Sequence, residues 1–319
     1  MSDITILLPI YNEKVDYVEN AVSSILKQTM KDIIIFITLD NPDNYILKNF
    51  ILDLKKKDSR IIFTVNSKNM GLPATLNSML DNVKTPYIAR MDGDDIADED
   101  RIRKQYMYMQ QHPEVDLCGT NIEYIDIDGK SIGKNNGIPR KTIQIEKCLK
   151  YKNCIAHPTF FAKTKMMKSV KYRDTLKYAQ DYDFVCRCVE KGYSLANLDE
   201  YLLKYRVVKL NPEKLVRQNM TAYYVRKLYR KRRLAQTENI AFLIDCSIKK
   251  YGQSELERKA SIKQSIQELR KMFYEKDRKM FLRDIYDLCV QHPYKIDGFI
   301  SNCIYRILIR KEQKSKNNE

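Results

Sequence analysis

The chain has 319 residues, of which 44% are hydrophobic and 31% are charged, and its formal net charge is +16. This composition excludes a wholly disordered chain, and the length suffices for one large domain or for an ordinary domain and a smaller one. No apolar stretch approaches the roughly 20 residues that span a bilayer, so we expect any membrane contact to be peripheral.

Strand and helix patterns alternate over the first 91 residues. We expect strands at Ile4–Leu8, Ile33–Leu39, Ile61–Val65 and Tyr87–Met91, and helices from Val18 to Leu26, Tyr45 to Lys56 and Pro73 to Asp81. This alternation predicts an α/β fold with a Rossmann-like, mostly parallel sheet between layers of helices.

Ligands of such sheets bind beyond the carboxyl ends of the strands. Here those ends carry Pro9 to Asn12, Asp40, Asn66 to Gly71, and Asp92 to Asp95. We therefore expect these four segments to converge on one face.

The pattern is more mixed between residues 115 and 210. We expect strands at Val115–Cys118, Asn121–Ile127 and Leu202–Val208, a tight turn at Asp128-Gly129, a loop and strand over Ala156–Phe161, and a helix from Asp181 to Lys191. From Pro212 onward the pattern is helical. The sequence thus predicts a first domain over residues 1–210 and a helical region over residues 211–319.

The most informative motif is the acidic run Asp92-Gly93-Asp94-Asp95 at a predicted strand end. Carboxylates at this density repel one another unless a cation or donor lies among them, and hard oxygen ligands suit Mg²⁺ or Mn²⁺. A solvated acidic turn is an equally good interpretation of the run alone. The chain has no dinucleotide-binding glycine motif and no P-loop, and the run does not fit an EF-hand.

An ordered set of motifs resembles the inverting family-2 glycosyltransferases, which have the type A nucleotide-sugar fold. The matching segments are Pro9-Ile10-Tyr11-Asn12-Glu13, Asp40, Asn69-Met70-Gly71-Leu72 with Asn77, Ala89 to Asp95 with Arg101 and Gln105, His157-Pro158, Ala179 to Asp183, and Tyr205-Arg206. The resemblance covers roughly residues 1–210 and leaves the last 109 residues uncovered.

The resemblance implies a role for each matching position. It implies nucleotide-sugar binding by Pro9, Tyr11, Glu13, Asp40, Lys68, Asn69, Asp92 and Gly93. Within that set Asp40 matches the acid that pairs with the base, usually uracil, and Asp92 lies near the ribose. Lys68 either reaches the diphosphate or is a solvated lysine. Asp94 matches the acid that coordinates Mn²⁺ or Mg²⁺, with Asp95 sharing or taking that role.

Asp181 matches the catalytic base, although Gln180 precedes it where relatives usually have Glu. Asp183 is the alternative base, and His157 is a metal or acceptor contact or, more often at such positions, a packed loop residue. Leu39 stands where many relatives carry a second acid before Asp40. The chain has no tryptophan and no Gln-x-x-Arg-Trp motif, which favours single addition of a sugar over processive synthesis.

The basic excess lies in the last third, where residues 211–319 hold 25 Lys and Arg against 13 Asp and Glu. It includes a basic run at residues 226–233 and an apolar stripe, which we define as Ile296, Phe299, Ile300, Ile304, Ile307 and Leu308, flanked by Arg306, Arg310 and Lys311. The stripe either lies on an anionic membrane or packs on the first domain or on a partner subunit. Nucleic-acid binding is unlikely because no such module is present.

The eight cysteines include no Cys-x-x-Cys pair, which predicts reduced thiols in the cytoplasm. The first residues lead straight into a strand, so we expect no signal peptide. We expect the protein to be cytoplasmic, with at most peripheral contact with the inner face of the membrane. We therefore expect a metal-dependent, inverting transferase that moves a sugar from a UDP-sugar to a glycan or lipid-linked oligosaccharide. The alternatives are a metal-dependent nucleotidyltransferase and a non-catalytic membrane or nucleic-acid binding protein.

Overall fold

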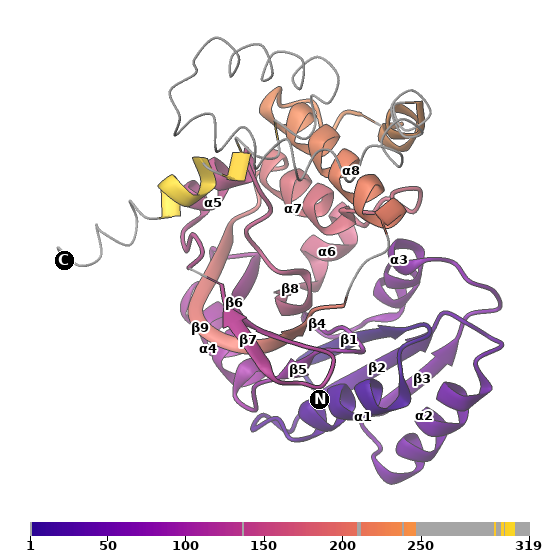
Figure 1. Cartoon of the computed structure of the whole chain (residues 1–319). Helices are drawn as coiled ribbons and strands as arrows, with labels where there is room; N and C mark the ends of the chain where they lie inside the picture. Colours follow the sequence, from indigo (N-terminus) through magenta and orange to yellow (C-terminus); the bar gives the residue numbers. More distant parts are fainter. Residues whose placement is uncertain are drawn as a thin grey trace.

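The structure, a computed structural model, describes residues 2–135, 137–208, 212–237, 239–246, 297, 301–302 and 304–309 (Figure 1). The elements in chain order are β1 (Ile4–Ile10), α1 (Val15–Leu26), β2 (Ile33–Leu39), α2 (Tyr45–Lys57), β3 (Ile61–Val65), α3 (Leu72–Asn82), β4 (Tyr87–Arg90), β5 (Ile96–Ala97), α4 (Arg101–Gln111), β6 (Leu117–Ile125), β7 (Ser131–Lys134), α5 (Thr142–Leu149), η1 (His157–Thr159), β8 (Phe161–Lys163), α6 (Thr164–Val170), α7 (Gln180–Glu190), β9 (Leu195–Arg206) and α8 (Pro212–Arg230).

The strands form one sheet in the order β3-β2-β1-β4-β8-β6-β9-β5, with β7 paired to β6. Pairing is parallel from β3 through β4, antiparallel where β8 joins β4 and β6, and parallel again between β6 and β9. The α/β fold class is therefore confirmed, with a sheet that is parallel at its start and mixed beyond β4.

The apolar run of β1 explains why the sheet is covered on both faces. All seven β1 residues are buried, and alternate side chains point to opposite faces. Ile4 and Ile6 pack in a core with α1, α2 and α4, whereas Leu7 packs in a core with α3, α6, α7 and α8. Each such side chain contributes roughly 1.5–3 kcal/mol on burial.

The second half of the sheet differs from the expected strands. The two strands expected at Val115–Cys118 and Asn121–Ile127 are one strand, β6. β6 stays paired with β9 through Thr120 and Asn121 because β9 bulges opposite them, between Leu198 and Leu203. β9 also begins at Leu195 rather than at Leu202. The turn expected at Asp128-Gly129 is confirmed, since Lys130 N–H donates to Asp126 Oδ1 and Gly129 has φ of +82°.

The described C-terminal residues pack on the same core as the sheet. Val225 and Tyr229 of α8 and Ile309 join the core that contains Leu7 and Leu117. Within the apolar stripe, Leu308 packs against this core and Ile307 is 53% exposed, while Ile296, Phe299 and Ile300 lie outside the described residues, as do Arg310 and Lys311. The boundary at residue 210 stays a prediction.

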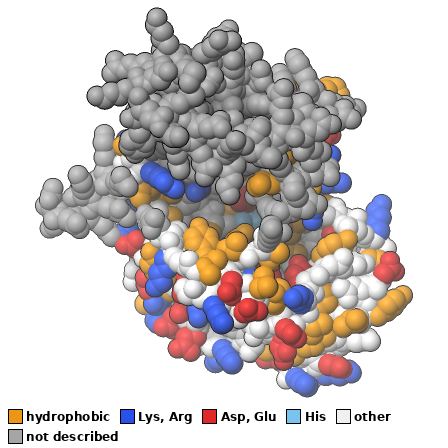
Figure 2. Space-filling view, in the orientation of Figure 1, with side chains coloured by type: hydrophobic (Ala, Val, Ile, Leu, Met, Phe, Trp, Pro, Cys, Tyr) orange, Lys and Arg blue, Asp and Glu red, His pale blue; other side chains and the backbone are white. Residues whose placement is uncertain are grey.

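Among the described residues no helix combines the length and the apolar character needed to cross a bilayer. On the visible face of the described part, acidic and basic side chains are interspersed (Figure 2). Arg226 and Arg230 of the basic run bind Asp297, and Arg232 binds Glu146, so part of the C-terminal charge is balanced within the chain.

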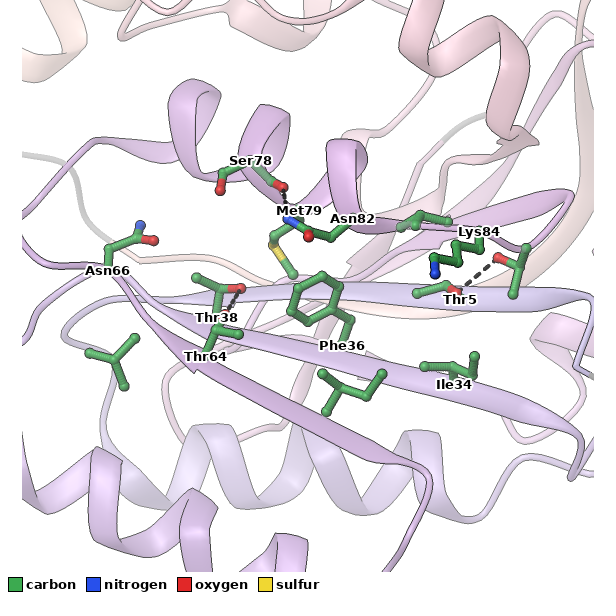
Figure 3. A pocket seen from close by; sticks show the side chains of 14 residues that line it. Thr5, Ile34, Phe36, Thr38, Thr64, Asn66, Ser78, Met79, Asn82 and Lys84 are labelled. Atoms are coloured by element: carbon green, nitrogen blue, oxygen red, sulfur yellow. Dashed lines mark hydrogen bonds between the residues drawn. The ribbon is translucent and has the colours of Figure 1, made fainter.

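A cavity of about 530 Å³ lies beside α3 over strands β1, β2 and β3 (Figure 3). Phe36 of β2 and Met79 of α3 line it from facing sides, and two hydrogen-bonded threonine pairs lie in its wall, Thr38 with Thr64 and Thr5 with Thr85.

Candidate active site

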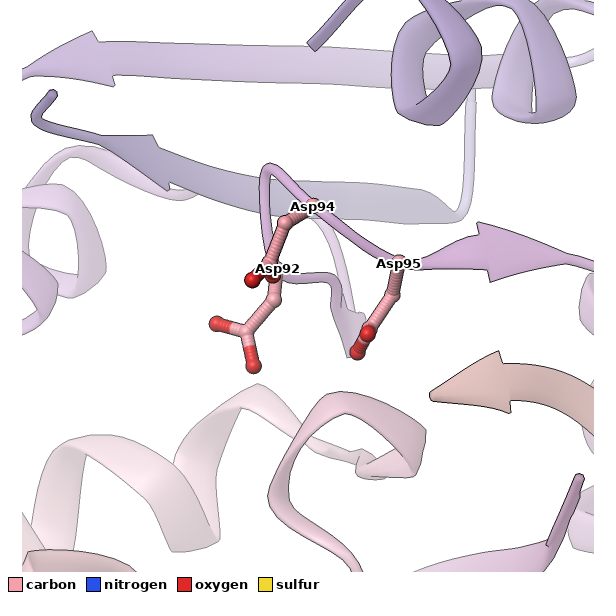
Figure 4. Close-up of side chains that lie close together, drawn as sticks. All are labelled: Asp92, Asp94 and Asp95. Carbon is pink, nitrogen blue, oxygen red and sulfur yellow. The ribbon is translucent and has the colours of Figure 1, made fainter. Parts of the chain in front are cut away.

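Three carboxylates occupy the loop between β4 and β5. Asp92, Asp94 and Asp95 direct their side chains to the same side of this loop (Figure 4). One oxygen from each lies within 4.8 Å of the others. Asp95 is buried, and Asp92 and Asp94 are half-buried. The acidic run is thus a compact cluster rather than a dispersed surface turn.

The cluster carries unbalanced negative charge. Burial and the charges of Asp92 and Glu13 raise the pKa of Asp94 to about 7. Burial, with Asp92 and Asp94, raises the pKa of Asp95 well above its usual range, and Asp95 Oδ2 is buried without a hydrogen-bond partner. Carboxylates in this state fit a divalent cation, whose charge would offset both the burial and the repulsion.

Arg90, the last residue of β4, holds one of the three carboxylates. It is 2% exposed; Nη1 donates to Asp92 Oδ2 at 2.6 Å, and Nη2 donates to Asp92 Oδ1. Behind it, Arg101 Nη2 donates to Arg90 O at 2.5 Å, and Arg101 Nε donates to Gln105 Oε1 at 3.1 Å. Sequence reasoning gave Arg90 no role; its signal is an arginine ending an otherwise apolar strand.

Arg206, at the end of β9, holds the Asp95 carboxylate and the Asp94 main-chain carbonyl. Its N–H donates to Asp95 Oδ1 at 2.8 Å, and its Nε donates to Asp94 O at 2.8 Å. Its guanidinium also lies 4.2 Å from the centre of the Tyr17 ring. The acidic loop is therefore held by two buried arginines that come from strands far apart in the sequence.

The loop after β1 contacts the acidic cluster. Glu13 Oε2 accepts a hydrogen bond from Tyr11 N–H at 2.6 Å. Burial, and to a lesser extent the charge of Asp92, raise the pKa of Glu13, although this hydrogen bond acts to lower it. A Cβ on Gly93 would lie 2.8 Å from Ile10 Cγ2, so this position has room for glycine only. Pro9 lies in β1 opposite Thr38 of β2, and Tyr11 is exposed.

Asp40 organises the loop after β3. It is 5% exposed and accepts hydrogen bonds from Asn66 Nδ2, Met70 N–H and Gly71 N–H at 2.7–2.8 Å. Lys68 and Asn69 are exposed on this loop, and among the described residues no hydrogen bond or ion pair joins them to the acidic cluster. The expected contact of Asp40 with a base stays a prediction.

Asp181 lies in the first turn of α7, half-buried, and Asn153 Nδ2 donates to its Oδ2 at 2.7 Å. Burial raises its pKa, whereas the nearby positive charge of Arg90 opposes the rise. The preceding Ala179 adopts the left-handed conformation (φ 47°), which is costly for a residue with a Cβ. Asp181 and the acidic cluster thus share Arg90 as an electrostatic neighbour.

Asp183 has a different environment from Asp181. Its side chain is 0% exposed and binds Arg173 at 3.0 Å and Arg187 at 2.7 Å. His157 is buried as well; its Nε2 lies 2.8 Å from Tyr172 Oη, and burial lowers its pKa well below the usual value. Both side chains are packed residues, which favours Asp181 over Asp183 as a base.

Residues 5–169 match the family described as Glycosyl transferase family 2. An uncharacterized glycosyltransferase of Methanocaldococcus jannaschii is 32% identical over 75% of this chain and 83% of its own length. The O-antigen biosynthesis glycosyltransferase WbnJ of Escherichia coli is 31% identical over 72% and 88%, and the amylovoran biosynthesis glycosyltransferase AmsE of Erwinia amylovora is 32% identical over 63% and 75%.

Among solved structures, residues 1–349 of TarS from S. aureus superpose with a TM-score of 0.59 at 13% identity, covering 99% of this chain and 92% of that one. The same TarS segment in complex with UDP-GlcNAc gives a TM-score of 0.57 at 14% identity. At this level of identity the likeness shows the fold.

Proposed function

Because this chain belongs to glycosyl transferase family 2, we propose that it transfers a sugar from UDP to a hydroxyl group of a glycan or lipid-linked oligosaccharide, one sugar at a time and with inversion. That the protein is a glycosyltransferase follows from the family and from the relatives that carry the same function in their names. The observation that supports the metal-dependent, inverting mechanism is the cluster of Asp92, Asp94 and Asp95. The charge of Arg90 acts on both Asp94 in this cluster and Asp181.

In the proposed site, Asp94 and Asp95 hold Mn²⁺ or Mg²⁺, and Asp92 is held against the sugar nucleotide by Arg90. The chemistry that a divalent ion would supply there is neutralisation of the charge that develops on the departing diphosphate. Glu13 and Gly93 form the wall beside it, where the absence of a side chain on Gly93 lets the two loops approach. UDP is favoured as the nucleotide because a TarS structure of this fold binds UDP-GlcNAc.

Asp181 acts as the general base. Its carboxylate accepts the proton of the acceptor hydroxyl while that oxygen attacks the anomeric carbon and the bond from this carbon to the diphosphate breaks. One in-line displacement of this kind inverts the anomeric centre without a covalent intermediate. The raised pKa of Asp181 makes it a better proton acceptor than a solvated aspartate, while the hydrogen bond from Asn153 keeps the side chain oriented.

The acceptor is a growing surface polysaccharide in this proposal, as the names of the O-antigen and amylovoran relatives suggest. Such acceptors are carried on lipids, and contact with the inner face of an anionic membrane through the exposed part of the apolar stripe, around Ile307, belongs to the proposal.

Thermal-shift titration with UDP in the presence and absence of Mn²⁺ tests the proposal. We expect UDP to stabilise the protein with Mn²⁺ and Asp94→Ala to remove that metal-dependent stabilisation and the turnover. Glu19→Ala, an exposed acid on α1, is the matched control. Wild-type UDP stabilisation by Mn²⁺ that persists in Asp94→Ala would refute the metal site. Release of pyrophosphate instead of UDP would identify the nucleotidyltransferase alternative.

A further inference from the structure

A second cavity, of about 1000 Å³, opens beside Asp181. Its walls come from β6, β9, the end of β7, residues 152–156 and a C-terminal segment that is yellow in Figure 1. The C-terminal residues that line it are Asn302, Tyr305, Arg306 and Ile309. Its lining is more polar than apolar and includes three tyrosines, Tyr124, Tyr201 and Tyr305. Tyrosine rings offer an apolar face and a polar end together, which suits the mixed surface of a sugar.

Two chains of contacts join this cavity to the proposed reaction centre. Asn153 lines the cavity and donates to the Asp181 carboxylate at 2.7 Å. Tyr124 lines it too and packs edge-on against Tyr205, whose centre lies 6.2 Å away. Burial and the charges of Asp92, Asp95, Asp94 and Asp181 raise the pKa of Tyr205. A molecule in the cavity would therefore contact Asn153 and Tyr124, which are direct neighbours of Asp181 and Tyr205.

The rim of the cavity carries cations without matching acids. Lys152 and Arg306 lie close enough that the charge of Arg306, after burial, lowers the pKa of Lys152. In the described part of the chain, neither forms an ion pair with a carboxylate. On the other side, Lys134 lies 4.8 Å from the centre of the Tyr201 ring. Like charges held together in this way are stabilised by an anion between them.

Among the described residues that line the cavity, the one carboxylate is that of Asp199, and it is already paired. Its Oδ2 binds Arg140, and its Oδ1 accepts from Asn121 Nδ2 at 3.2 Å. The Lys152 and Arg306 charges thus remain available to a bound molecule.

We propose that this cavity is the acceptor site and that Lys152 and Arg306 bind an anionic group of the acceptor, a phosphate or a carboxylate, while its sugar hydroxyl reaches Asp181. The inference rests on the proposed transferase function. It narrows the acceptor from any glycan to one that carries negative charge near the accepting sugar.

Calorimetric titration of the full chain tests this, with UDP and Mn²⁺ saturating so that the donor site is filled. The probes are glucose 1-phosphate, glucuronate and the neutral methyl glucoside. We expect the anionic probes to bind more tightly than methyl glucoside, with the stronger of the two identifying phosphate or carboxylate. Lys152→Ala and Arg306→Ala should each weaken that binding roughly two- to fivefold, as for contacts between exposed opposite charges, and Lys152→Glu should weaken it further. Lys147→Ala, an exposed lysine on α5 outside the cavity, should bind like wild type.

Equal binding of charged and neutral probes, no binding of anionic probes, or anion binding that is unchanged in Lys152→Ala and Arg306→Ala would overturn the proposal. UDP affinity measured first in each protein keeps the two questions apart. Failure of the wild type to bind UDP with Mn²⁺ would refute the proposed donor, whereas normal UDP binding without an anion preference would refute the acceptor site alone.

Discussion

Exchange of Asp183 for asparagine separates a structural carboxylate from a catalytic one. Asp183 is 0% exposed and binds both Arg173 and Arg187. Arg187 otherwise donates to Val170 O and Lys171 O, and Arg173 to Leu234 O, so without Asp183 both guanidinium groups would lose their ion pair and keep these main-chain acceptors. Breaking a buried ion pair from one side costs about 3–5 kcal/mol.

Since asparagine keeps one acceptor oxygen, we expect Asp183→Asn to lose about 3 kcal/mol of the free energy of unfolding. For a domain of this size, that loss lowers Tm by roughly 6–12 °C. Asp181→Asn, the same exchange two residues earlier, is the matched control. It should keep Tm within a few degrees and bind UDP, while its turnover falls by about 10²–10⁴-fold.

Scanning fluorimetry and turnover of UDP-sugar measured on both variants provide the test. If Asp183→Asn kept the wild-type Tm and lost turnover, Asp183 would be the base and the ion-pair reasoning would be wrong. Normal turnover in Asp181→Asn would show that Asp181 is not the base.

Three further changes test other parts of the site. Asn153→Ala removes the hydrogen bond that favours the charged form of Asp181, so the pKa of Asp181 should rise. The rate is lost as pH falls through that pKa, so the acid limb of the kcat/KM profile should move to higher pH. An acid limb that does not move would contradict this role of Asn153. Gly93→Ala should lower the free energy of unfolding, measured with denaturant, by about 1–3 kcal/mol, because the new Cβ meets Ile10 Cγ2. Leucine lacks that Cγ2 methyl, so adding Ile10→Leu to Gly93→Ala should restore part of the lost stability. Ile307→Asp should reduce co-sedimentation with vesicles of anionic lipid without lowering Tm, and equal sedimentation would exclude membrane binding through Ile307.

Much of the first half of the fold is predictable from local sequence. The apolar runs of β1 and β2 and the turn-forming residues after them determine strands, helices and the edge at which the acidic loop lies. The acidic run was visible for the same reason, because its three members are neighbours in the sequence.

The parts that sequence did not predict depend on partners far along the chain. The role of Arg90 requires knowing that Arg101 supports it from behind, and the extra length of β9 depends on its pairing with β6. Asp40 illustrates the limit at a single residue. An aspartate after a buried strand is equally compatible with a ligand contact and with a loop anchor, and only the three donors around it reveal the anchoring contacts.

The contacts of Arg206 have a consequence for how the protein is made. The hydrogen bond from Arg206 to Asp95 joins residues 111 positions apart, and that to Asp94 spans 112. A nascent chain that ends before β9 therefore contains every member of the acidic run but none of the groups by which β9 fixes it. Closing so long a loop is slow and entropically costly until the intervening strands have paired. The arrangement of the acidic loop is thus completed only after β9 has been synthesised and has paired. A shortened chain without β9 contains all three aspartates and the contact of Arg90 with Asp92, but lacks the Arg206 contacts to Asp94 and Asp95.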